Sequence, residues 1–205
     1  PLPEDLRRTI VLTGTRRVGK TTIQYQMIDR LLKKGVPPQK ILFVSMDHPM
    51  LKLSGLNDLL ECYHSNVYAE QDCYYFFDEI QYASDWDKWM KTIYDMQPET
   101  KMVATGSASP ALMKGSSESG AGRWSVIQVP TLSFYEYCAL IGARVPELGP
   151  EIRPTAFLHM AQQERTAVMI KLEEVQNYFM RYLRVGGFPE LELASDDLMA
   201  QQIMR

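Results

Sequence analysis

The sequence predicts an α/β protein in which a parallel five-stranded sheet is flanked by helices. Short, continuous apolar runs alternate with amphipathic helical patterns, which is typical of strands buried on both faces. A glycine-rich loop joins the first apolar run to the first helix, and polar residues follow several later runs. Ligands of parallel sheets bind at these strand ends. The five predicted strands are residues 9–13, 41–45, 73–77, 101–105 and 125–129.

Helical patterns connect the predicted strands. Residues 20–32 carry an apolar stripe, residues 56–63 form a second pattern, and Ser84 is expected to cap a third that begins near Trp86. A long pattern returns at about residues 165–184. Three prolines mark a linker before it, namely Pro146, Pro150 and Pro154. We therefore expect an ATPase-type core at 1–145 and a small helical lid region at 146–205.

Composition sets limits on the function. The chain has 205 residues and a formal net charge of −3, without a Lys/Arg-rich block, so overall charge gives nucleic-acid binding no support. Its three cysteines lack metal-type spacing and are typical of reduced thiols in a cytoplasmic protein. No apolar run is long enough for a membrane span. The chain starts almost directly on a strand and stops in helix-like sequence, which suggests a fragment of a longer protein.

The first predicted strand leads into the pattern G-x-x-x-x-G-K-[ST], the Walker A pattern of phosphate-binding loops. It is formed by Gly14, Thr15, Arg16, Arg17, Val18, Gly19, Lys20 and Thr21, with Thr22 next in the helix. Glycines let backbone N–H groups close around a phosphate, and the helix start adds a positive dipole end. Lys20 is expected to reach the β/γ-phosphates of ATP, and Thr21 to bind Mg²⁺.

Other interpretations of this stretch stay open. A glycine-rich turn before an ordinary helix gives the same pattern. Arg16 and Arg17 either help to hold phosphates or are solvated loop residues. Thr22 either extends the hydroxyl pair or simply belongs to the first helical turn, which we favour.

A second constellation follows the third predicted strand, where Asp78 and Glu79 come after an apolar run. This is the Walker B pattern. Asp78 is expected to hold Mg²⁺ opposite Thr21, and Glu79 to activate the water that attacks the γ-phosphate. Alone, such a pair usually caps the next element, but behind a Walker A loop the catalytic interpretation is favoured.

Two further candidates complete the predicted site. Ser107 and Thr105 lie at the end of the fourth strand, and either could sense the γ-phosphate, with Ser107 the first choice. The alternative is simple turn chemistry around Gly106. Arg123 is a candidate donor of positive charge to the transition state, in cis or in trans, or else a surface arginine. A role in trans would require a homo-oligomer.

With these residues in place, the chain resembles a family of bacterial and archaeal AAA+-like ATPases related to the STAND group. The resemblance rests on residues 14–22, 77–81, 86–91, 105–109, 122–123, 132–137 and 186–190. It implies an AAA+-type core followed by a helical lid, in which Pro189 packs near the adenine. The run around Gly187 and Pro189 equally suits a helix stop with a left-handed glycine. Members often carry an uncharacterised C-terminal domain, which is expected to follow this chain.

The leading functional hypothesis is an ATPase that binds ATP and Mg²⁺ and whose nucleotide sets the position of the lid. Its partners are ATP or ADP and an unknown client, which is a protein or DNA, with no direct membrane insertion. A small-molecule kinase is the first alternative, although Asp78 and Glu79 favour water as the acceptor. A GTPase is disfavoured because Thr100–Val103 lacks the aspartate of a guanine-reading element. A module that holds ATP with little turnover is the third hypothesis.

Overall fold

The computed structural model describes residues 8–52, 55–107, 122–148 and 154–190. The contacts divide the chain into two compact units, Pro1–Pro130 and Thr131–Arg205. Each unit has its own arrangement of secondary structure, so the two are described separately.

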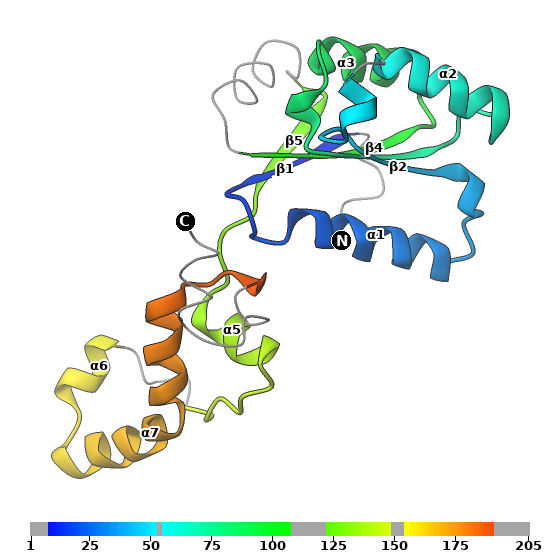
Figure 1. The fold of residues 1–205 in the computed structure, drawn as a ribbon. Helices are drawn as coiled ribbons and strands as arrows, with labels where there is room; N and C mark the ends of the chain where they lie inside the picture. The colour runs from blue at the N-terminus through cyan, green and yellow to red at the C-terminus, as the bar shows by residue number, and fades with distance from the viewer. Residues whose placement is uncertain (1–7, 53–54, 108–121, 149–153, 191–205) are drawn as a thin grey trace. The chain divides into compact units, whose positions relative to one another are not determined.

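The first unit is built on a parallel sheet of five strands in the order β2-β3-β4-β1-β5 (Figure 1). The strands are β1 (Thr9–Gly14), β2 (Ile41–Ser45), β3 (Tyr74–Asp78), β4 (Lys101–Ser107) and β5 (Trp124–Gln128). β4 lies between β1 and β3, with Gly14 opposite Ser107 and Phe77 opposite Ala104. The predicted fold class is confirmed. The carboxyl ends of β1, β3 and β4 therefore meet at one edge of the sheet.

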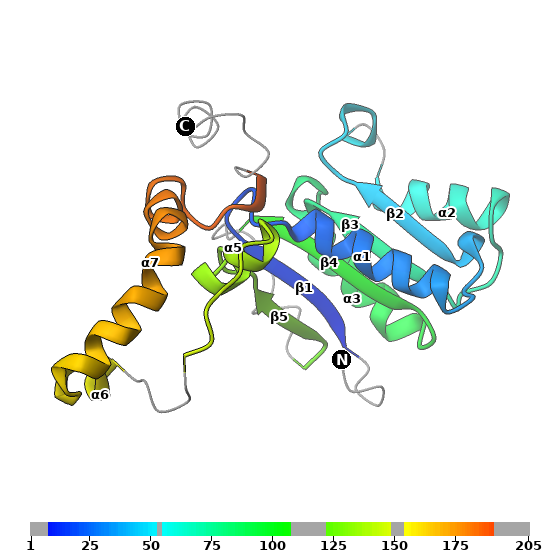
Figure 2. The ribbon, with the colours of Figure 1, turned by 90° about the horizontal axis from the view of Figure 1, so that it is seen from below.

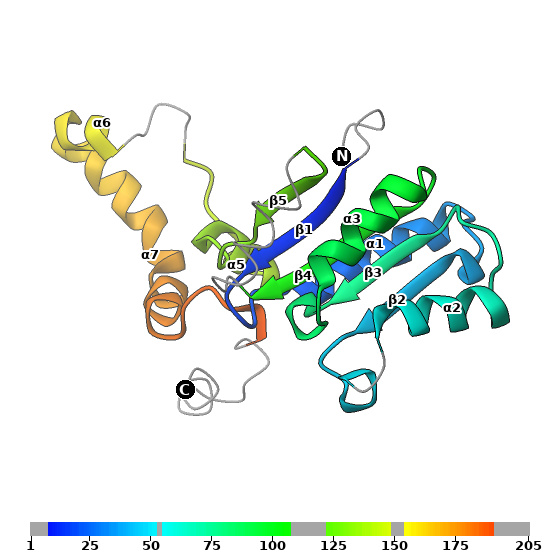
Figure 3. The same ribbon diagram turned by 90° about the horizontal axis from the view of Figure 1, so that it is seen from above.

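Helices cover both faces of this sheet. They are α1 (Lys20–Lys33), α2 (Leu56–Asn66) and α3 (Trp86–Met96). The connections between strands and helices contain the 3₁₀ turns Pro38–Lys40, Pro49–Lys52 and Ile80–Tyr82. The apolar stripe of α1 packs on Ile10 and Leu12. Figure 2 shows α1 across this face of the sheet from below. Val11 belongs to the other core, which it shares with residues of α2 and α3. Figure 3 shows these two helices on the opposite face of the sheet. Successive strand residues alternate in this way because their side chains point to opposite faces.

One expected detail of the first unit is wrong. The N-cap of α3 is Asp85 rather than Ser84, and no side chain caps the helix. Asp85 instead adopts a left-handed backbone with φ of 53°, and its carbonyl accepts hydrogen bonds from the N–H groups of Lys88 and Trp89. The helix itself begins at Trp86, where the sequence places it.

The second unit is helical and consists of α5 (Phe134–Leu140), α6 (Pro154–His159) and α7 (Gln162–Val185). α5 packs on α7 through an aromatic cluster, in which Phe134 meets Phe179 edge-on at 5.0 Å between ring centroids and Tyr137 lies 5.4 Å from Tyr182. Aromatic pairs at these separations stabilise a contact beyond the area that they bury. Through this packing α5 belongs to the compact unit Thr131–Arg205, while the expected domain boundary near residue 145 stays a prediction. Of the expected linker prolines, Pro150 lies outside the described residues.

Two glycines end α7 and return the chain to the start of the second unit. Gly186 caps the helix with φ of 73° and ψ of 178°, a combination open essentially to glycine alone. A glycine ends the helix, as expected, but it is Gly186 rather than Gly187, and its extended ψ differs from the left-handed cap that the sequence predicts. Gly187 then lies against Leu132, whose N–H donates to the Gly187 carbonyl at 2.7 Å. Tyr182 donates its hydroxyl to the Leu132 carbonyl at 2.8 Å, which closes the same contact.

Replacing Gly187 with alanine is expected to destabilise the second unit. A Cβ at this position would lie 2.1 Å from the Leu132 oxygen and 2.9 Å from its nitrogen, and backbone atoms cannot move aside as a flexible side chain can. We expect a loss of about 1–3 kcal/mol in the free energy of unfolding, measured by urea titration of the helical circular dichroism signal. Gly55→Ala is the control because its Cβ would meet nothing nearer than 3.8 Å. Equal midpoints for the two variants would contradict the prediction.

Candidate functional site

The glycine-rich loop connects β1 directly to α1 and begins at the carboxyl edge of the sheet. Gly14 must be glycine because its φ is 157° and a Cβ would lie 2.5 Å from the Val129 oxygen. Arg17 and Gly19 take φ values of 70° and 92°, so the loop bends twice before the first helical turn. Thr15, Arg16 and Arg17 are exposed, whereas Val18 is buried and anchors the loop in the core.

Lys20 is the first residue of α1 and is only 5% exposed. Its Nζ donates hydrogen bonds to the carbonyls of Gly14 at 3.1 Å and Thr15 at 2.9 Å. Burial lowers the pKa of Lys20, and the nearby carboxylates of Glu79 and Asp78 partly counter this effect. An ammonium carries three donors, so one remains for an anion held by the loop.

Hydroxyl groups from two neighbouring segments bond to the Asp78 carboxylate and to the backbone of Glu79. Thr21 donates to Asp78 Oδ2 at 2.9 Å, and Thr105 donates to Asp78 Oδ1. Thr105 Oγ1 also accepts the N–H of Glu79 at 2.9 Å. Glu79 itself has left-handed φ and ψ of 51° and 48°, a strained backbone for a residue with a side chain. The structure thus joins the Walker A and Walker B residues directly through Thr21 and Asp78, while Thr105 of the intervening strand joins Asp78 to the backbone of Glu79.

Thr105→Val is expected to loosen this arrangement while keeping the shape of the side chain. Thr105 is fully buried, and valine would leave the Glu79 N–H and one oxygen of Asp78 without their hydroxyl partner. We expect a loss of about 1–3 kcal/mol in the free energy of unfolding, measured by urea denaturation. Thr105→Ser keeps the hydroxyl and should retain most of that stability. The interpretation fails if the serine variant is as destabilised as the valine variant.

The remaining predicted residues are placed differently. Ser107 lies beside Gly14 in the strand ladder, and its contact with a γ-phosphate remains a prediction. The hydroxyl that bonds to the Asp78 carboxylate from this strand is that of Thr105. Arg123 lies at the opposite edge, next to the start of β1, where it forms an ion pair with Asp95 at 2.9 Å. The structure does not bring Arg123 to the loop of its own chain. Pro189 is half-buried in the second unit.

Sequence reasoning missed a buried glutamine behind the loop. Gln24 is fully buried, and its Nε2 donates to the carbonyls of Phe77 at 3.2 Å and Val103 at 3.3 Å. It ties α1 to β3 and β4 one turn after Lys20. The sequence contains a signal for this residue, because Gln24 comes directly after Ile23 and is a polar residue on the apolar stripe of the helix.

The residues at this edge fit a magnesium ion. Thr21 and Asp78 present a hydroxyl and a carboxylate oxygen within 2.9 Å of each other, and Mg²⁺ prefers such oxygen ligands together with water and phosphate. Within the described residues, no group of three or more His, Cys, Asp or Glu could hold a metal by itself. The donor set therefore suits an ion shared with a phosphate rather than one enclosed by protein.

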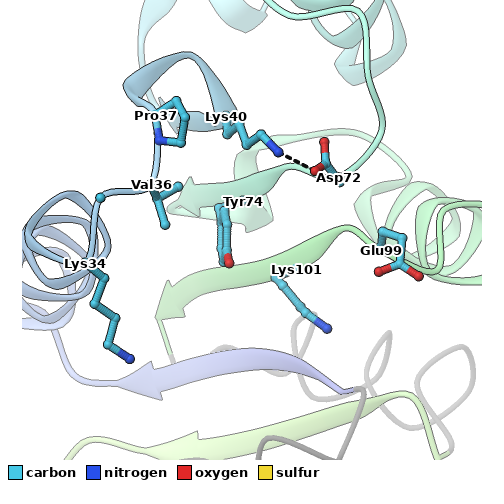
Figure 4. A pocket seen from close by; sticks show the side chains of 9 residues that line it. Lys34, Val36, Pro37, Lys40, Asp72, Tyr74, Glu99 and Lys101 are labelled. Carbon is cyan, nitrogen blue, oxygen red and sulfur yellow. Dashed lines mark hydrogen bonds and ion pairs between the residues drawn. The ribbon is translucent and has the colours of Figure 1, made fainter.

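A separate hollow of about 400 Å³ lies at the opposite edge of the sheet (Figure 4). It is lined by Lys34, Gly35, Val36, Pro37, Lys40, Asp72, Tyr74, Glu99 and Lys101. Lys40 is hydrogen-bonded to Asp72, and this contact raises the pKa of Lys40 and lowers that of Asp72. None of the predicted site residues lines this hollow.

A parallel sheet whose first strand opens into this loop defines a class, that of nucleotide-binding, ATPase-like proteins with a P-loop. The comparison with known families agrees, since the model of the AAA domain matches residues 6–138. That range is more than half of the 205 residues, and the chain belongs to the AAA domain family. The resemblance drawn from the sequence is confirmed at this level. Its relation to the STAND group and the further C-terminal domain remain predictions.

Relatives of the chain occur in archaea and bacteria. The uncharacterized protein MJ1637 of Methanocaldococcus jannaschii is 30% identical over 202 residues, which are 96% of this chain and 41% of that protein. MJ1544 of the same organism is 25% identical, with coverages of 95% and 38%. An uncharacterized protein of Haemophilus influenzae is 25% identical, with coverages of 92% and 41%. The chain spans about two fifths of the length of these relatives.

Solved structures give weaker likenesses. The ORC2 protein of Aeropyrum pernix has a TM-score of 0.47 at 14% identity, covering 67% of this chain and 45% of that one. PCH-2 of C. elegans has a TM-score of 0.42 at 17% identity, with coverages of 68% and 39%. Such values carry no information on function. In the part of the chain that the structure describes, no helix has the length and apolar character to cross a bilayer.

Proposed function

We propose that the protein binds ATP with Mg²⁺ and hydrolyses it, and that the bound nucleotide acts as a conformational switch. One observation carries the proposal. A chain of hydrogen bonds joins Thr21, Asp78, Thr105 and Glu79 beside the buried ammonium of Lys20. Phosphate-binding groups and a candidate general base thus share one edge of the sheet. Hydrolysis needs this combination, whereas simple nucleotide storage needs only the loop.

Each residue has a separate role in the proposed reaction. The loop from Gly14 to Thr21 holds the phosphates, and Lys20 offsets negative charge at the β/γ-phosphates. Bound Mg²⁺, held by Thr21 and Asp78, supplies further neutralisation of phosphate charge. Glu79 takes a proton from the attacking water while the water oxygen bonds to the γ-phosphorus. The bond between that phosphorus and the leaving oxygen of ADP breaks.

Ser107 and Arg123 have lesser places in the proposal. Ser107, beside Gly14 in the ladder, is proposed to contact the γ-phosphate. Arg123 is left out of the reaction in its own chain because it is bonded to Asp95 at the opposite edge. Action on a neighbouring copy would require a homo-oligomer, which sedimentation of the chain with ATP would reveal.

The switch is proposed to involve the helical second unit. By its resemblance to STAND-related ATPases, Pro189 is proposed to approach the adenine, and loss of γ-phosphate contacts is proposed to release the unit. The client of this switch is proposed to be a protein or DNA.

The test is the release of inorganic phosphate from ATP and Mg²⁺ without any added acceptor. Phosphate release in water supports hydrolysis, whereas formation of ADP without free phosphate, and only after addition of a small-molecule hydroxyl acceptor, would support a kinase. GTP serves as the comparison nucleotide, since a GTPase would turn it over faster than ATP. Tight ATP binding without any release would favour the binding module.

A further inference from the structure

Gln81 lies in the 3₁₀ turn after β3, two residues beyond the candidate general base. Its Nε2 donates a hydrogen bond to Glu79 Oε2. The backbone of the turn is closed by the N–H of Tyr82, which donates to the Glu79 carbonyl at 3.1 Å, and by the N–H of Ala83, which donates to the Ile80 carbonyl at 2.9 Å. The carboxylate of Glu79 is therefore held by a side chain of its own turn.

The orientation of the Gln81 amide follows from its partner. An ionised carboxylate only accepts hydrogen bonds, so the NH₂ group must face it and the amide oxygen must point away. That oxygen is buried, and no donor from the described residues reaches it. Most buried polar atoms have a partner, so a glutamine serving only to fill space would be unusual here. The one side-chain hydrogen bond of this amide goes to the candidate base.

The base needs a partner of this kind. The backbone of Glu79 is fixed by its N–H bond to Thr105 at 2.9 Å and by its left-handed conformation. Its side chain is half-buried and has three rotatable bonds, so the carboxylate could take several positions. A general base must stay within hydrogen-bond reach of the water from which it takes a proton.

The turn is also connected to the phosphate-binding loop. Arg16 Nη2 donates to the Tyr82 hydroxyl at 3.2 Å, and Tyr82 is the residue next to Gln81. The same turn thus contacts the phosphate-binding loop through Tyr82 and the candidate general base through Gln81.

We propose that Gln81 is a positioning residue that fixes the carboxylate of Glu79 in the orientation for proton transfer from water. This inference rests on the proposed hydrolysis of ATP. Gln81 acts through Glu79 and touches neither the nucleotide nor the water. Its removal therefore affects the rate of the chemical step and not the binding of ATP.

Gln81→Met tests the proposal because methionine has a similar length and no amide. We expect kcat to fall by about tenfold to about a hundredfold with an unchanged KM for ATP, as for a displaced catalytic group. Gln26→Met, an exposed position on α1, is the matched control and should leave both constants unchanged. In a Glu79→Gln background, Gln81→Met should cause no further loss, whereas a merely structural role would lower turnover in both backgrounds.

The possible outcomes separate this inference from the proposed function. If Glu79→Gln abolishes phosphate release and Gln81→Met leaves kcat unchanged, the positioning role is overturned and the hydrolysis stands. A raised KM with unchanged kcat also overturns it, by assigning Gln81 to nucleotide binding. If the wild-type chain shows no release that depends on Glu79, the proposed function fails and takes the role of Gln81 with it. A double-mutant cycle of Glu79→Ala and Gln81→Met in thermal unfolding tests the contact itself, and additive shifts would exclude it.

Discussion

Glu79→Gln is expected to abolish most ATP turnover while leaving ATP binding intact. The amide of glutamine is nearly isosteric with the carboxylate but cannot take a proton from the attacking water. A positioned general base contributes about 10²–10⁴-fold in rate, and we expect a decrease of that size in phosphate release. The affinity for fluorescent ATP should stay the same, because Glu79 lies outside the phosphate-binding loop.

The control for this variant is Glu99→Gln, which makes the same chemical change at an exposed glutamate at the opposite edge of the sheet. It should release phosphate at the wild-type rate. Wild-type phosphate release from the Glu79 variant would remove this residue as the base. A loss of ATP binding would show instead that Glu79 helps to hold the nucleotide.

Lys20→Ala is expected to weaken ATP binding by about tenfold to about a hundredfold. A hydrogen bond to a charged group contributes about 1.5–3 kcal/mol, and each 1.4 kcal/mol is a factor of ten in affinity. Lys20 also donates to the Gly14 and Thr15 carbonyls, so its removal loosens the loop as well. Titration with fluorescent ATP measures the affinity, and circular dichroism confirms that the variant is folded.

Lys91→Ala is the matched control, because this lysine is exposed on α3 and the described residues offer it no hydrogen bond or ion pair. It should bind ATP as the wild type does. If the Lys20 variant also binds ATP with wild-type affinity, the assignment of the phosphate-binding loop is wrong.

Much of the first unit could be predicted because its elements are locally encoded. Residues 41–45 form a strand with the predicted bounds, and α1 extends only one residue beyond the predicted helix. Continuous apolar runs can be buried on both faces only in a covered parallel sheet. The cap of α3 was mispredicted because Asp85 adopts a left-handed conformation that a capping pattern does not indicate.

The boundary between the units was harder to predict. Proline-rich sequence predicts a domain boundary near residue 145, whereas the aromatic contacts of Phe134 and Tyr137 with Tyr182 join α5 to the compact unit that begins at Thr131. Such contacts connect residues about fifty positions apart, and local sequence patterns contain no information about them. The same holds for Gly187, whose close approach to Leu132 explains why this position has no side chain.

The sequence by itself determined the phosphate-binding loop, the pair of carboxylates and the alternation of strands and helices, because each depends on residues adjacent in the chain. Only the tertiary structure decided that β4 lies between β1 and β3. This order makes Thr105 the hydroxyl that bonds to Asp78 and Glu79, and it leaves Arg123 at the far edge with Asp95. Which strands become neighbours depends on the burial of whole faces of the sheet, and no short segment of sequence specifies it.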